Sequence, residues 1–81
     1  MILVDIEFPA NGQKYDFRLD ENAYIANIID EIGEIMFYGE ESNSQNIKDL
    51  LLCDYTHYRI LSPTLTLKQC GIGSGARLTL L

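Results

Sequence analysis

The sequence has no long hydrophobic run and no basic segment at its N-terminus. No stretch of its 81 residues approaches the roughly 18 apolar residues that a membrane-spanning helix needs. The first eight residues, MILVDIEF, contain Asp5 and Glu7 and no basic side chain, which is unlike a secretory signal peptide. Both absences argue against a membrane-inserted or secreted protein, and we expect the chain to stay in the cytoplasm.

Positive charge is also scarce. Six lysines and arginines stand against twelve aspartates and glutamates, for a formal net charge of -6, and the six are scattered along the chain. Binding to nucleic acid needs clustered lysine and arginine, so a nucleic-acid partner is disfavoured. An acidic domain suits a basic protein partner, although the same charge is also common on ordinary soluble proteins.

Histidine and cysteine are too few for most site chemistry. His57 is the only histidine, and Cys53 and Cys70 are the only cysteines. A metal site needs three or four converging ligands, and a Cys–His nucleophile needs a thiol beside the imidazole, whereas both cysteines stand in apolar surroundings. We therefore expect no metal, no cofactor and no enzymatic activity. Two reduced, partly buried thiols are favoured over a disulfide.

The first twenty residues have the period of a β-hairpin. Hydrophobic and polar side chains alternate through 2–8, and the alternation resumes with Tyr15, Phe17 and Leu19. Between the two runs, the segment PANG supplies residues that tolerate a tight turn. We predict a hairpin with one core face and one charged, solvated face. By the same parity, Phe8, Tyr15 and Phe17 are predicted to lie in the core.

After the hairpin the period changes from two to that of a helix. Apolar residues recur at helical spacing through 23–38. Asp20 or Asn22 can cap the start of this helix, and Gly39 stands where a left-handed C-cap is wanted. The wholly polar segment 40–46 predicts a loop.

Three short strands are predicted in the C-terminal half. The apolar run 50–53 is typical of a buried central strand, 54–58 of a turn, 59–61 of an edge strand, and 77–81 of the closing strand. The order β-β-α-β-β-β predicts an α+β fold, and the length leaves room for a single domain, 1–81. We expect ten residues in its core, namely Ile2, Val4, Ile6, Phe17, Ile25, Ile29, Ile32, Ile72, Leu78 and Leu80.

A glycine-rich segment, Cys70-Gly71-Ile72-Gly73-Ser74-Gly75, precedes the last strand. A phosphate-binding loop would lead into a helix whose free amides face the anion, and it would end in Lys-Ser or Lys-Thr. Here only strand residues follow the glycines. The segment is therefore predicted to be a turn with Ile72 packed into the core.

The element order and the final Leu-x-Leu resemble the β-grasp fold of ubiquitin. The most specific likeness is Leu67-Lys68-Gln69-Cys70-Gly71-Ile72, then a glycine-containing turn, then Arg77-Leu78. This segment is similar to that of the YukD-type ubiquitin-like proteins found with bacterial type VII (WXG100) secretion systems. The resemblance implies a mixed five-stranded sheet, with strands in the order 2-1-5-3-4, packed on one helix. It also implies a small cytoplasmic accessory protein that binds other proteins and does not catalyse a reaction.

We predict that a protein partner binds the sheet face turned away from the helix. Leu3 and Leu81 are expected to be neighbours there because the first and last strands pair. An apolar spot rimmed by acids would suit a basic, partly apolar partner; the alternative is an ordinary solvated face. Parity assigns six residues to this candidate site, namely Leu3, Asp5, Asp16, Arg18, Thr79 and Leu81.

No Gly-Gly tail follows the last strand. Covalent use of a ubiquitin-like protein requires a flexible tail of this kind, and here the glycines precede the strand 77–81. We expect a protein that is not conjugated and that works by reversible contact. The alternative is a ubiquitin-like carrier or modifier that is activated at its C-terminus.

Overall fold

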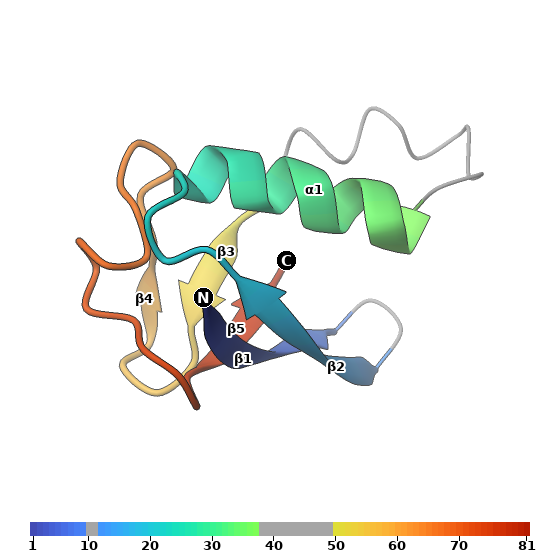
Figure 1. The fold of residues 1–81 in the computed structure, drawn as a ribbon. Coiled ribbons are helices and arrows are strands. Elements are labelled where there is room, and N and C mark those ends of the chain that lie inside the picture. The colour runs from blue at the N-terminus through green and yellow to red at the C-terminus, as the bar shows by residue number, and fades with distance from the viewer. Residues whose placement is uncertain (10–11, 38–49) are drawn as a thin grey trace.

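A computed structural model describes residues 1–9, 12–37 and 50–81. In this part of the chain five strands form one mixed sheet, in the order β2-β1-β5-β3-β4. A helix lies across one face of the sheet (Figure 1). The α+β class and the strand order are both confirmed. The elements are β1 (Ile2–Phe8), β2 (Gln13–Leu19), α1 (Ile25–Phe37), β3 (Leu52–Asp54), β4 (Arg59–Ile60) and β5 (Arg77–Leu80).

The last strand stands at the centre of the sheet. β5 pairs in parallel with β1 and antiparallel with β3. The two outer pairings, of β1 with β2 and of β3 with β4, are both antiparallel. Because β5 joins the two hairpin-like halves, the sheet is complete only when the C-terminal strand is in place.

The hydrophobic core lies between the sheet and α1. Fifteen buried hydrophobic side chains form it in the described part of the chain. Nine of the ten predicted core residues are among them, and the tenth, Phe17, is half-buried at the edge of the cluster. Phe8 and Leu19 are also buried, as the strand alternation predicts, and the remaining core residues are Ile28, Leu52, Leu61 and Leu67.

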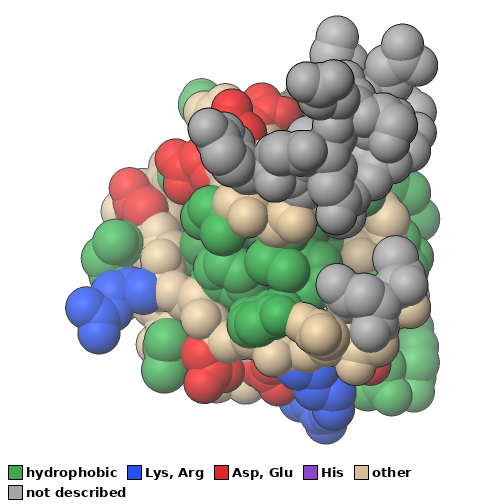
Figure 2. Space-filling model, turned by 90° about the vertical axis from the view of Figure 1, so that its right-hand side faces the viewer, with side chains coloured by type: hydrophobic (Ala, Val, Ile, Leu, Met, Phe, Trp, Pro, Cys, Tyr) green, Lys and Arg blue, Asp and Glu red, His purple; other side chains and the backbone are tan. Residues whose placement is uncertain are grey.

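The prediction that Tyr15 belongs to the core is wrong, because its side chain is 40% exposed. β2 is an edge strand, so its side chains have a neighbouring strand on one side only. Tyr15 packs edge-on against Phe8 and Phe17, with ring centroids 5.9 and 6.5 Å away. Hydrophobic side chains consequently reach the surface at the end of the molecule seen in Figure 2.

α1 starts at Ile25, two residues later than predicted. Neither Asp20 nor Asn22 caps it. Asp20 Oδ1 instead accepts a hydrogen bond from the Asn22 amide, at 2.9 Å, within the turn that precedes the helix. The predicted C-cap Gly39 and the predicted loop 40–46 lie outside the described residues.

The N-terminal amides of α1 are satisfied by a loop from the other half of the chain. Ile25 N donates to Leu65 O at 2.9 Å, and Ala26 N donates to Pro63 O at 3.1 Å. The first four N–H groups of a helix have no partner within it, so a tertiary contact here does the work of a side-chain cap. These bonds fix the start of α1 against the segment that connects β4 to β5.

The boundaries of all three C-terminal strands differ from the predicted ones, and β5 ends at Leu80 rather than at residue 81. β3 begins at Leu52 and ends at Asp54, so that Asp54 is a strand residue rather than the first residue of a turn. β4 contains only Arg59 and Ile60, and Leu61 follows it as a buried core residue. The change that matters for function is the placement of an acidic side chain, Asp54, on the core side of the sheet.

The glycine-rich segment forms the predicted turn. Gly71 and Gly75 have φ angles of 78° and 88°, which L-residues with side chains rarely adopt. Ile72 is buried, and its amide donates to Leu67 O at 2.9 Å. The segment leads directly into β5, so it offers no helix N-terminus to a phosphate.

Candidate protein-binding face

The predicted binding residues lie on the outer face, by which we mean the face of the sheet turned away from α1. It is made by the side chains that alternate with core residues along each strand. Side-chain exposure varies across it. Of the six predicted residues, Leu3, Asp16, Arg18 and Leu81 are exposed, Asp5 is half-buried and Thr79 is buried.

The prediction that Leu3 and Leu81 are neighbours is wrong. β1 and β5 run parallel, so the start of one strand lies beside the start of the other. Leu3 O accepts a hydrogen bond from Gly75 N at 2.8 Å, before β5 begins, whereas Glu7 stands opposite Thr79. Leu81 follows Thr79 by two residues and therefore lies beyond Glu7. The two leucines are at opposite ends of the strand pair.

The cross-strand neighbour of Leu81 is Leu51. Their backbones exchange two hydrogen bonds, each of 2.9 Å. The two side chains are 55% and 42% exposed, and Ile60 on β4 is 62% exposed. Cys53 connects them, because it stands opposite both Thr79 on β5 and Ile60 on β4. We call Leu51, Cys53, Ile60, Thr79 and Leu81 the outer patch.

Thr79 forms the buried centre of the outer patch. Only 9% of the residue is exposed, and its hydroxyl Oγ1 has no hydrogen-bond partner among the described residues. Glu7 and Cys53 stand directly opposite it on the two neighbouring strands. The middle of the outer face is thus buried between neighbouring strands, with apolar side chains exposed toward the β3–β4 side.

Sequence reasoning missed the part of the outer patch on β3 and β4. The apolar run 50–53 predicts a strand buried on much of its surface, whereas only Leu52 is fully buried and Leu51 is exposed. A signal was present in the sequence. Leu51 and Cys53 alternate with Leu52 and Asp54, which is the period of a strand with two different faces.

An arginine and two tyrosines border the outer patch. Arg77 Cζ lies 5.2 Å from the centroid of the Tyr55 ring, and the Tyr55 and Tyr58 rings are 6.0 Å apart. Tyr58 is 85% exposed. On its other side, Arg77 stands opposite Asp5 of β1. Aromatic and arginine side chains of this kind are enriched in protein interfaces.

Comparison with known proteins gives matches in structure only. No protein-family model matches the chain, and no curated protein matches it. Among solved structures, the N-terminal ubiquitin-like domain in the 4931431F19Rik protein aligns with a TM-score of 0.76 at 22% identity, over 99% of this chain and 72% of that one. A designed protein based on human erythrocytic ubiquitin gives 0.75 at 22% identity over 100% and 90%. Caldiarchaeum subterraneum ubiquitin gives 0.74 at 16% identity over 98% and 89%.

The fold is ubiquitin-like. The alignment covers essentially the whole chain, in agreement with the predicted resemblance to β-grasp proteins. At these identities the likeness establishes the fold and leaves the function to be argued from the residues.

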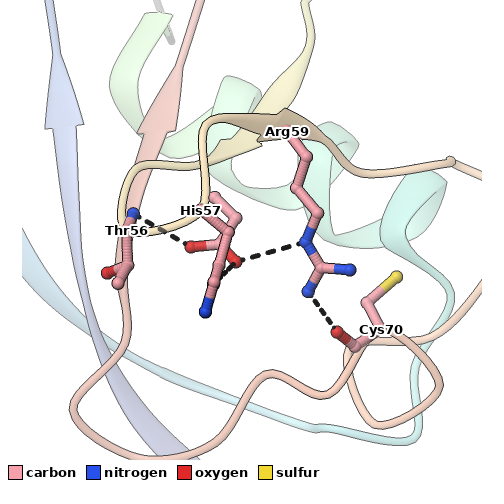
Figure 3. A network of polar contacts seen from close by, with 5 residues as sticks. Thr56, His57, Arg59 and Cys70 are labelled. Atoms are coloured by element: carbon pink, nitrogen blue, oxygen red, sulfur yellow. Dashed lines mark hydrogen bonds and ion pairs between the residues drawn. The ribbon is translucent and has the colours of Figure 1, made fainter.

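The domain holds a buried carboxylate, that of Asp54, at the end of β3. Figure 3 shows the polar contacts around it, with Thr56, His57, Arg59 and Cys70 labelled. Asp54 is 2% exposed, and its Oδ2 lies 2.7 Å from His57 Nδ1. The same oxygen accepts from Arg59 Nε at 3.4 Å, and Oδ1 accepts from Thr56 N at 3.1 Å. Arg59 Nη2 also donates to Cys70 O at 2.5 Å. We call this group the Asp54 network.

The charges of the Asp54 network stabilise the local structure around the β3–β4 turn. Burial raises the pKa of the Asp54 carboxyl, but hydrogen bonds and charge from His57 and Arg59 outweigh burial and hold the pKa below its ordinary value. The carboxylate therefore stays ionised near neutral pH. Its hydrogen bonds and ion pairs stabilise the β3–β4 turn, and the hydrogen bond from Arg59 to Cys70 O links this turn to the turn at Cys70.

The two thiols of the domain are half-buried, as predicted, and both are free in the structure. Burial raises the pKa of the Cys53 thiol, which makes it a poorer nucleophile at neutral pH. Cys70 contributes its carbonyl oxygen to the Asp54 network. Within residues 1–9, 12–37 and 50–81, no three histidine, cysteine or acidic side chains come together in a way that could hold a metal ion.

The length of the helix bears on the expectation that the chain has no membrane-spanning segment. α1 has thirteen residues, and no helix in the described ranges is long and apolar enough to cross a membrane.

Proposed function

We propose that this chain is a non-catalytic protein-binding module that acts by reversible contact and is not conjugated to other proteins. We further propose that it is a cytoplasmic accessory or regulator of a bacterial type VII secretion system. The observation that carries the binding role is the outer patch, where the exposed Leu51 and Leu81 are cross-strand neighbours and the exposed Ile60 of β4 stands opposite Cys53. Contiguous exposed apolar surface with a polar rim is characteristic of interaction sites.

The surroundings of the outer patch suggest the chemistry of the partner. Asp5 and Asp16 stand opposite each other on β1 and β2, and Glu7 flanks the buried Thr79. The chain as a whole carries a net charge of -6. A partner with a basic rim around an apolar centre would match both features.

The assignment to type VII secretion depends on the C-terminal segment. Leu67-Lys68-Gln69-Cys70-Gly71-Ile72 followed by Arg77-Leu78 is similar to the corresponding segment of YukD-type proteins. Leu67 and Ile72 are core residues, and Arg77 stacks on Tyr55 beside the outer patch. On this proposal, the partner is a component of the secretion machinery, such as a WXG100 protein or the soluble part of an FtsK-type ATPase.

A titration followed by amide chemical shifts tests the binding role. With a WXG100 protein or the soluble ATPase domain as the added partner, we expect perturbations at Leu51, Ile60 and Leu81 and none along α1. Ile60→Asp should weaken binding about tenfold or more, as loss of an interface hot spot does. The matched control is Asn27→Asp, an equal charge change on the exposed surface of α1.

Two outcomes would contradict the proposal. Perturbations confined to α1 would place the binding site on the opposite face of the domain. A ladder of covalent adducts that survives denaturation, or a C-terminal thiocarboxylate found by intact-mass analysis of cell extracts, would favour the carrier or modifier alternative.

A further inference from the structure

β2 exposes seven residues of strand edge along the outside of the sheet. It is the terminal strand, and it pairs with β1 over its whole length without a bulge. β4, the strand at the opposite edge, has only two residues. Proteins normally protect a long edge by shortening it, bending it, covering it or placing charged side chains on it, because its free backbone groups can pair with another strand. β2 is neither shortened nor bulged and contains no proline, and its charged residues are Lys14, Asp16 and Arg18.

The free backbone groups of β2 can be identified from the neighbouring pair. Asp5 N donates to Ala76 O at 2.9 Å and Leu3 O accepts from Gly75 N at 2.8 Å, so odd-numbered residues of β1 direct their backbone groups toward β5. Backbone direction alternates along a strand, so even-numbered residues of β1 face β2. Their partners there are the odd-numbered residues 13–19.

Lys14, Asp16 and Arg18 therefore direct their N–H and C=O groups away from the sheet. Their side chains point to the outer face, where Asp16 stands opposite Asp5 of β1. Like charges directly opposite each other are destabilising. In the described part of the chain, Asp16 forms no ion pair that would offset this repulsion. Among the described residues, the edge thus presents backbone groups and a carboxylate that have no partner.

The order of charges along β2 disfavours some antiparallel pairings of the strand with itself, and its apolar side chains distinguish the others. Centring a two-fold axis on Asp16 would place Asp16 against Asp16 and Lys14 against Arg18 of the second copy, which is repulsive. Centring it on Tyr15 pairs Lys14 with Asp16 but places Gln13 opposite Phe17. A third register matches oppositely charged residues with each other and apolar residues with each other.

That register has its two-fold axis at Phe17. Asp16 then stands opposite Arg18 of the second copy, and the symmetry repeats this pair on the other side of the axis. On the α1 side of the sheet, Phe17 meets Phe17 and Tyr15 meets Leu19. Phe17 is half-buried and Tyr15 is 40% exposed, so this pairing covers apolar surface that a single chain leaves open.

We propose that the protein forms a symmetric homodimer in which two β2 edges pair antiparallel about Phe17, giving one continuous ten-stranded sheet. The occupant of the edge is a second copy of this chain, because its own charge order is complementary to itself in this register. The dimer leaves the outer patch of each copy free. It would therefore present two partner-binding patches on one rigid sheet, which strengthens binding to a repeated or clustered partner.

Charge exchange on β2 provides the test. Sedimentation velocity should show the wild-type chain moving from a 9.2 kDa monomer to a dimer as concentration rises. Asp16→Arg should weaken dimerisation about tenfold or more, because two attractive pairs become repulsive. Arg18→Asp should do the same. Neither variant should unfold the chain, since Asp16→Arg removes the repulsion with Asp5 and Arg18 is an exposed position outside the core.

A mixture of the two single variants gives the decisive result. The two introduced charges are complementary between chains, so Asp16→Arg and Arg18→Asp should form a heterodimer together although each is monomeric alone. Native mass spectrometry separates this heterodimer from the homodimers by mass. The matched control is Asp30→Arg, the same charge change on an exposed position of α1, which should leave dimerisation unchanged.

Three results would overturn the proposal. The first is a wild-type chain that stays monomeric up to about 1 mM. The second is a dimer that Asp16→Arg and Arg18→Asp do not weaken. The third is a mixture of the two variants that stays monomeric while the wild type dimerises, which would exclude this register. None of these measurements needs the partner proposed above, so their failure leaves that proposal standing.

Discussion

Asp54 and His57 form a close contact, 2.7 Å from Oδ2 to Nδ1, between a buried carboxylate and a largely exposed imidazole. The imidazole covers a carboxylate that strand pairing places on the core side of the sheet, opposite Arg59. A buried charge without partners would be costly, and here the partners come from the same short turn. The stability of the β3–β4 hairpin therefore depends on the ionisation of one side chain.

Replacing Asp54 with asparagine should destabilise the domain by about 1–3 kcal/mol, because His57 and Arg59 lose a charged acceptor. Urea unfolding at neutral pH measures this loss. Asp30→Asn, an exposed acidic position on α1, is the control and should change the free energy of unfolding by less than about 0.5 kcal/mol. Equal effects of the two substitutions would show that the Asp54 network contributes nothing.

The Asp54 network also predicts a dependence on pH. The pKa of Asp54 is lower in the folded domain than its ordinary value of about 3.9. Its contribution to stability is therefore fully present above the ordinary value and is lost as pH falls through the lower, folded value. The difference in unfolding free energy between wild type and Asp54→Asn should shrink on acidification below about pH 4. A difference that grows there would contradict the direction of the shift.

Ile29→Ala should cost about 2–5 kcal/mol, from lost burial and the cavity left between α1 and the sheet. Ile29 is 7% exposed, whereas Ile35 on the same helix is 65% exposed. Ile35→Ala is therefore the matched control, and we expect a change below about 0.5 kcal/mol. Denaturant unfolding of both variants checks the orientation of α1. A loss below about 0.5 kcal/mol for Ile29→Ala would show that the buried side of the helix is misassigned.

Gly75→Ala should destabilise the domain by about 1–2 kcal/mol. The reason is the backbone, because φ at Gly75 is 88° and no atom lies within 4 Å of an added Cβ. Gly73 has the same open surroundings without a positive φ, so Gly73→Ala is the control and should be nearly neutral. Because neither added Cβ meets another atom, the difference in stability between the two variants, measured by thermal unfolding, reports the backbone strain at Gly75. Equal losses of stability would argue against that strain.

Thr79→Val should stabilise the isolated domain by about 1 kcal/mol, because it replaces a buried hydroxyl that has no partner among the described residues. Thr79→Ser keeps the hydroxyl and removes the methyl group, so it should destabilise. Chemical unfolding of the three forms gives both values. If Thr79→Val is less stable than wild type, Oγ1 has a hydrogen-bond partner in solution.

Local patterns in the sequence were enough to determine the elements and most of the core. Alternation in 2–8 and 77–80 depends only on the period of a strand, and the spacing of Ile25, Ile29 and Ile32 depends only on the period of a helix. The turn at 70–75 likewise follows from residue type, because glycine tolerates the positive φ angles that Gly71 and Gly75 adopt. Each of these features is decided within a few residues of chain, and each was predicted correctly.

Tertiary structure decided the features that depend on residues far apart in the chain. Whether Leu3 meets Leu81 is settled by the parallel register of β1 and β5, which alternation alone does not reveal. The first amides of α1 find their acceptors at Pro63 and Leu65, which no local capping pattern indicates. The burial of Asp54 results from its place at the end of β3 under His57 and Arg59. Side-chain period determines which face a residue occupies, whereas its neighbours on that face depend on strand register and on loops that only the folded chain brings together.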